Sequence, residues 1–183
     1  VSDWSSDVCS SDLGVLMATD RRTTGAQVED QAIELKASTR VRELATLGNI
    51  SATSFNRMLL VTGEVPDETQ RARVEDALGR IENVRSVVNE LAVAGNSSAG
   101  SRANDVQLGL RVKASFVDAK DLQANAVKVV VERAHVYLMG RVTEREAERA
   151  SDLASRVPGV VKVVRVFELI SEEELARMMP AAR

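Results

Sequence analysis

Apolar and polar positions along the chain follow two periods, one helical and one typical of strands, and the same order of periods occurs twice. In residues 28–47 the apolar positions recur every three or four residues, which predicts a helix with one buried face. These apolar positions are Ile33, Ala37, Val41 and Leu44. Gly48 and Asn49 follow directly and predict the end of this helix.

Short segments rich in β-branched residues come next in each half of the chain. Residues 50–55 and 59–65 form one pair, and residues 127–132 and 135–142 form the other. Only two or three residues separate the members of each pair, a spacing that predicts tight β-hairpins.

A second helix and a last strand complete each half. Asp67 precedes Gln70 and Thr143 precedes Glu146 by three residues, a spacing that predicts a side-chain cap at each helix start. Apolar runs at residues 84–93 and 160–170 predict the last strands. The expected fold class is therefore α+β. Each unit has the order α-β-β-α-β, with a small three-stranded mixed sheet packed on two helices.

The two halves are an internal repeat. A shift of 77 residues places Lys36-Ala37-Ser38 on Lys113-Ala114-Ser115 and Gly63 on Gly140. We therefore expect units at residues 28–93 and 104–170, with a linker at 94–103. The same shift places Ile33 on Leu110, which predicts that one face of the second unit's first helix is core. That face carries Val106, Leu110, Ala114 and Val117.

The two ends of the chain differ from the repeats. Residues 1–13 show no apolar period and resemble a translated sequencing adapter, so we interpret them as a non-native scar. We expect that the natural targeting segment has been lost at this point. Residues 14–27 are expected to be a disordered lead-in. The tail, residues 171–183, opens with Ser171 and Glu174, which predicts a capped short helix.

Composition and charge argue against nucleic-acid binding, a Cys/His metal site and Cys–His catalysis. The chain has 24 basic and 27 acidic residues and a formal charge of −3, without the basic surplus of a nucleic-acid-binding protein. It has one Cys and one His, so neither a Cys/His metal site nor a Cys–His catalytic pair is expected. His135 has no nucleophile or paired carboxylate near it by motif, and we interpret it as a hairpin residue. We expect no enzyme activity and no cofactor.

The repeated unit resembles the BON domain. The features that carry the resemblance are Gly63 or Gly140 before a capped helix, the Val-Pro-Gly-Val turn at residues 157–160, and the stretch 136–147. Two such units behind Asp20-Arg21-Arg22-Thr23 resemble the DolP family of outer-membrane lipoproteins. The resemblance implies a periplasmic protein at the inner leaflet of the outer membrane. It also implies a second BON domain that contacts anionic phospholipid, and a role in outer-membrane integrity.

The expected lipid contact lies on the first helix of the second unit. Apolar side chains at 108, 112 and 116 share a face that the first unit mostly lacks, and two cations flank it. Relatives place a lipid-facing helix here, and some carry Trp where this chain has Gln. The predicted lipid-binding residues are Gln107, Leu108, Arg111, Val112, Lys113, Phe116 and Val117.

Two alternatives stay open at this level. The stripe at 108, 112 and 116 would equally suit packing against the other BON domain. The whole protein would also suit a soluble periplasmic adaptor or chaperone-like protein of the OsmY type, with envelope proteins as partners. Residues 104–170 carry 11 basic and 9 acidic residues, and this surplus of cations favours the contact with anionic lipid.

Overall fold

The computed structural model describes residues 20–44 and 48–178, which form two repeats of the same architecture. The first repeat contains α2 (Thr24–Glu43), β1 (Asn49–Phe55), β2 (Met58–Val65), α3 (Glu68–Gly79) and β3 (Ser86–Val93). The second repeat contains α4 (Ala99–Asp118), the 3₁₀ turn η1 (Ala124–Ala126), β4 (Val127–Glu132), β5 (His135–Val142), α5 (Glu144–Ser155) and β6 (Lys162–Leu169). A last helix, α6 (Glu172–Met178), follows. The predicted scar at residues 1–13 lies outside the described residues.

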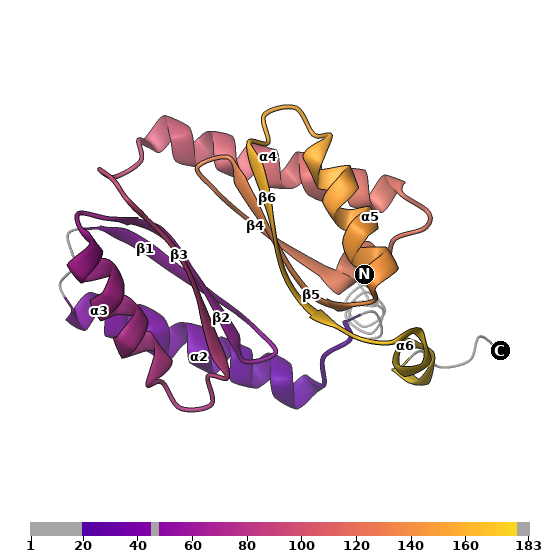
Figure 1. Ribbon diagram of the computed structural model, residues 1–183, viewed down its shortest axis with the longest axis horizontal. Coiled ribbons are helices and arrows are strands. Elements are labelled where there is room, and N and C mark those ends of the chain that lie inside the picture. Colours follow the sequence, from indigo (N-terminus) through magenta and orange to yellow (C-terminus); the bar gives the residue numbers. More distant parts are fainter. Residues whose placement is uncertain (1–19, 45–47, 179–183) are drawn as a thin grey trace, which may run out of the picture.

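Each repeat has one mixed sheet of three strands. In the first repeat β2 lies between β1, its antiparallel partner, and β3, its parallel partner. β5 has the same central position in the second repeat, between β4 and β6. The two sheets face each other and the helices lie on the outside (Figure 1). This arrangement confirms the predicted α+β fold with two α-β-β-α-β units.

Helix caps fix where the helices begin. The Gln70 amide donates to Asp67 at 2.8 Å, and Thr143 and Glu146 form the reciprocal capping box that the sequence predicts. Caps that the sequence analysis did not use lie at Thr23 and Ser98. Because of these caps α2 begins at Thr24 and α4 at Ala99, inside the segments expected to be a disordered lead-in and a linker.

A buried aspartate ties the first helix of each repeat to its hairpin. The two hairpin residues have positive φ angles in both repeats, 49° and 67° at Asn56 and Arg57, and their backbone amides point out of the turn. Asp30 of α2 accepts hydrogen bonds from both amides, at 2.7 and 2.8 Å. Asp105 of α4 does the same with the hairpin amides at 133 and 134, at 2.9 and 2.8 Å.

The aspartates correct the alignment of the repeats. Asp30 lies 26 residues before Asn56, whereas Asp105 lies 28 residues before Arg133. The first helices therefore align with a shift of 75 and not 77, because two additional residues lie between α4 and the hairpin of the second repeat. Leu108 thus corresponds to Ile33, and Val112 corresponds to Ala37.

The predicted core face of α4 is therefore wrong. Val106, Leu110 and Val117, expected in the core, are 65%, 63% and 72% exposed. The side chains at 108, 112 and 116 are 3%, 0% and 1% exposed and lie in the core of their own repeat, so they pack neither on lipid nor on the other repeat.

Apolar side chains between the two sheets form a third core. It contains Phe55 and Leu60 from the first repeat and Tyr137, Met139 and Val166 from the second. Burial, together with the charges of Glu90 and Glu132, raises the pKa of Tyr137 to about 12. The face of each sheet that its own helices leave open is therefore covered by the other repeat.

The segment before α2 contacts the second repeat. Arg21 donates to both carboxylate oxygens of Glu146 at 2.7 Å and to the backbone oxygen of Arg141 at 2.9 Å. Both charged side chains are 5% exposed. Arg22 pairs with Asp30 at 2.8 Å and stacks on the Phe55 ring. This chain segment thereby joins both repeats.

Candidate lipid-contact site

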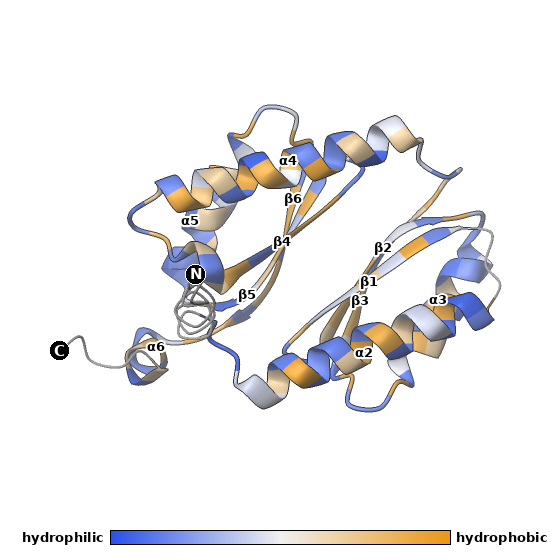
Figure 2. Ribbon diagram, turned by 180° about the vertical axis from the view of Figure 1, so that it is seen from behind, coloured by the Kyte–Doolittle hydropathy of each residue, from blue (hydrophilic) through white to orange (hydrophobic). Residues whose placement is uncertain are grey.

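The helix α4 has two apolar faces, one buried in the core of the second repeat and one exposed to solvent. Its inward face holds the buried side chains of the second core, and Asp105 anchors its first half to the hairpin. Its outward face carries Val106, Leu110 and Val117, which are among the exposed large apolar residues of the chain. Figure 2 shows apolar and polar residues alternating along α4 at the outer surface of the second repeat.

Cations flank the outward face of α4. At 100° per residue, Arg102 and Lys113 lie along one side of the apolar stripe, and Gln107 and Arg111 lie along the other. Arg102 and Arg111 donate to backbone oxygens of Ser97 and Pro158. Within residues 20–44 and 48–178, none of these three cations forms an ion pair with a carboxylate.

The corresponding face of α2 differs in both respects. With the shift of 75 residues, Val106 corresponds to Gln31 and Val117 to Arg42, and only Leu110 has an apolar equivalent, Leu35. Two of the α2 cations are also paired with carboxylates, whereas, within the described residues, Arg42 donates only to Ser38. Lys36 pairs with Glu82 at 3.2 Å, and Arg40 pairs with Glu43 at 3.0 Å. A continuous apolar face with unpaired cations is therefore a property of α4 and not of α2.

The structure divides the predicted lipid-binding residues into two groups. Gln107, Arg111, Lys113 and Val117 are exposed on α4. Leu108, Val112 and Phe116 point into the core, and their prediction as an exposed stripe is wrong. The sequence analysis missed the exposed pair Val106 and Leu110. The match of Asp30 with Asp105 places this pair on the exposed face, and the hydrogen bonds of both aspartates to the hairpin amides show that match.

The residue that the sequence singles out for possible chemistry, His135, lies in a hairpin of the second repeat. His135 is the first residue of β5, and its register partner is Glu132 across the hairpin. In the described part of the chain no group of three or more His, Cys, Asp or Glu residues is arranged to hold a metal ion. None of the described helices is both long and apolar enough to span a bilayer.

The family model of the BON domain matches residues 29–95 and 104–170, and the chain therefore belongs to the BON family, with two BON domains in tandem. It is similar to the outer membrane lipoprotein DolP of Haemophilus influenzae, with 36% identity over 158 residues, which are 84% of this chain and 81% of that protein.

Further relatives and solved structures show more distant likeness. The 21 kDa hemolysin of Actinobacillus pleuropneumoniae is 25% identical over 154 residues, which are 82% of this chain and 79% of the hemolysin. A solved structure of CdsD, a structural protein of the type III secretion system of Chlamydia trachomatis, is 12% identical. It covers 86% of this chain and 99% of the CdsD chain, with a TM-score of 0.32.

Proposed function

We propose that the chain is a non-enzymatic envelope protein that binds anionic phospholipid through the outward face of α4 in its second BON domain. In this proposal it acts in the periplasm, at the inner leaflet of the outer membrane, and supports the integrity of that membrane. The similarity to an outer membrane lipoprotein supports the location. The observation that carries the lipid contact is the exposed stripe Val106, Leu110 and Val117 beside unpaired cations.

The physical basis is that of an amphipathic helix lying in the membrane interface. Apolar side chains that leave water release roughly 25 cal/mol per Å² of buried apolar area. Each Lys or Arg close to an anionic surface contributes about 1 kcal/mol, a contribution that salt screens. The stripe has no aromatic residue, because position 107 is Gln, so binding depends on three aliphatic side chains and three cations. We therefore expect weak, reversible and salt-sensitive binding.

The matched pair Leu110 and Leu35 tests the proposal. These two leucines occupy equivalent positions of the two repeats and are 63% and 66% exposed, so neither change disturbs a core. We expect Leu110→Glu to weaken co-sedimentation with vesicles of phosphatidylglycerol and phosphatidylethanolamine at least tenfold. Such a loss corresponds to about 1.4 kcal/mol, within the range of one lost aliphatic contact. Leu35→Glu is expected to bind as the parent protein does.

Two results would contradict this proposal. One is equal vesicle binding by the parent and Leu110→Glu proteins. The other is that the parent protein binds purely zwitterionic vesicles in about 0.5 M salt as strongly as it binds anionic vesicles in low salt. The cations would then contribute nothing to binding.

A further inference from the structure

The two hairpins expose equivalent backbone groups at the sheet edges. β1 and β4 are edge strands, and Ser54 and Val131 have the same place in them, one residue before the strand end. In a two-residue hairpin the residues next to the turn bond to each other, so the preceding residue directs its amide and carbonyl away from the partner strand. Ser54 and Val131 therefore each offer one N–H and one C=O at an open edge.

Side chains close this edge in the first repeat. The Ser54 amide donates to Glu34 Oε1 at 2.8 Å. Lys128 Nζ donates to the Ser54 carbonyl oxygen at 3.3 Å and pairs with Glu34 at 3.0 Å. Both outward groups of Ser54 thus have partners from within the chain, and an additional strand has nothing to bond there.

The equivalent edge of the second repeat lacks this closure. Glu34 lies four residues after Asp30, and the residue four after Asp105 is Gly109. A Cβ atom at Gly109 would meet only Val131 Cγ2, at 3.5 Å, so α4 reaches over the edge of β4 without a side chain. Across residues 20–44 and 48–178 no side-chain acceptor bonds to the Val131 amide.

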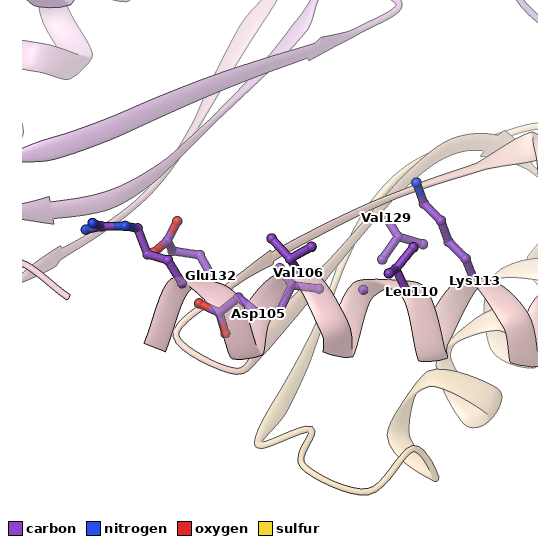
Figure 3. Close-up of a pocket in the computed structure, with 9 residues that line it drawn as sticks. Asp105, Val106, Leu110, Lys113, Val129 and Glu132 are labelled. Atoms are coloured by element: carbon purple, nitrogen blue, oxygen red, sulfur yellow. The ribbon is translucent and has the colours of Figure 1, made fainter. Parts of the chain in front are cut away.

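A groove occupies the place where the capping side chain is absent. It has a volume of about 370 Å³ and lies between α4 and β4 (Figure 3). Its apolar walls include Val106 and Leu110 from the helix and Val129 and Val131 from the strand. Figure 3 shows Asp105 and Glu132 at one end, Lys113 at the other, and Val106, Leu110 and Val129 between them.

We propose that this groove binds an extended peptide that adds a strand to the free edge of β4. An acyl chain would fill the apolar groove but would leave the outward amides and carbonyls of β4 without partners, whereas a peptide backbone bonds to them. The β4 edge is thus a protein-interaction site. It borders the proposed lipid contact, because Val106, Leu110 and Lys113 belong both to the groove and to the outward face of α4.

The charged side chains at the two ends of the groove indicate the charge and the direction of the bound peptide. Glu132 has a buried carboxylate oxygen without a hydrogen-bond partner among the described residues. Burial and the charges of Glu64 and Asp105 raise the pKa of Glu132, and the charges of Arg133 and Arg102 oppose this rise only in part. A cation of the peptide fits at this end, and a carboxylate fits near Lys113 at the other. The partner is therefore an extended segment with apolar residues at alternate positions, basic at its N-terminal end and acidic at its C-terminal end, antiparallel to β4.

The test uses the blocked hexapeptide Lys-Val-Thr-Val-Thr-Glu and the full chain. We expect the peptide to slow amide hydrogen exchange at Val129 and Val131 at least tenfold, with no such effect at Ser54. A peptide of the same sequence, N-methylated at alternate residues so that it cannot bond to the edge, is expected to give no protection. Equal protection by the methylated peptide, or none by either peptide at millimolar concentration, would overturn the proposal.

Substitutions at Gly109 test the missing cap. Gly109→Gln restores a side-chain acceptor of nearly the length of Glu34 without adding charge, and we expect it to weaken peptide binding at least tenfold. Gly109→Ala adds a methyl group but no acceptor and is expected to bind within about threefold of the parent. Vesicle binding of both variants should stay at the parent level. If anionic vesicles, and not the peptide, protect the Val131 amide, the groove belongs to the membrane contact and the peptide proposal is wrong.

Discussion

Phe116→Ala is expected to lower the free energy of unfolding by about 3–5 kcal/mol, a loss large enough to unfold the second repeat in part of the molecules. The Phe116 ring is 1% exposed and belongs to the core between α4, β4, β5 and α5. Its removal leaves a cavity that the surrounding strands and α5 fill only in part. Urea unfolding of the full chain, followed by circular dichroism, measures the effect.

The neighbouring residue is the control. Val117 is 72% exposed, and Val117→Ala is expected to change the free energy of unfolding by less than about 0.5 kcal/mol. Since the two residues are adjacent in the chain, the pair decides which face of α4 is core. A stable Phe116→Ala protein together with a destabilised Val117→Ala protein would show that α4 is rotated relative to the structure.

Arg21→Ala is expected to destabilise the protein by about 3–5 kcal/mol at pH 7, because it leaves Glu146 charged and buried without its main partner. Arg21 supplies two bonds of 2.7 Å to this carboxylate. A matched control is Arg80→Ala, which breaks an exposed pair with Asp76 in α3 and is expected to cost less than about 1 kcal/mol. Urea unfolding of both variants compares the two pairs.

The pH dependence separates the charge pair from simple packing. Burial raises the pKa of Glu146, but the bonds from Arg21 and the Thr143 amide outweigh burial, so the pKa lies below its ordinary value. The stabilisation is therefore present above the ordinary Glu pKa of about 4.3 and is lost as the pH falls through the lowered pKa. The difference between parent and Arg21→Ala should shrink as the pH falls from about 7 to 3. A difference that stays constant over this range would indicate lost packing only.

Local signals in the sequence were sufficient to predict the order and type of the elements. The two-residue hairpins at Asn56 and Arg133 and the caps at Asp67 and Thr143 depend only on neighbouring residues, and the structure confirms each of them. Such signals need no information on what packs where.

Which face of α4 is buried in the core could not be predicted from such local signals. From Val106 to Phe116 this helix carries apolar side chains on two faces, so periodicity alone does not distinguish the core face from the exposed face. Alignment of the two repeats could distinguish the faces, but the shift of 77 residues that fits the hairpins does not fit the first helices. Two additional residues before β4 change the shift of those helices to 75. Asp105, which fixes the register, would be read as a solvent-facing residue unless its bonds to the hairpin amides were known.

The peptide groove depends on a relation that only the folded chain shows. Glu34 is one of many helix carboxylates, and Gly109 alone is a weak signal in a helix. The contrast gains meaning once both positions are seen to lie over equivalent strand edges, one closed and one open.

The packing of the two sheets has a consequence for the order of folding. Each repeat contains its own complete helix-and-sheet core, so the first can fold as soon as its residues are available. Its outer sheet face, with Phe55 and Leu60, finds its cover only in strands that lie more than 70 residues later in the chain. A chain that folds from its N-terminal end therefore passes through a partly folded intermediate in which the apolar outer face of the first sheet is exposed to solvent. At high protein concentration this intermediate would aggregate with other chains through the exposed sheet face.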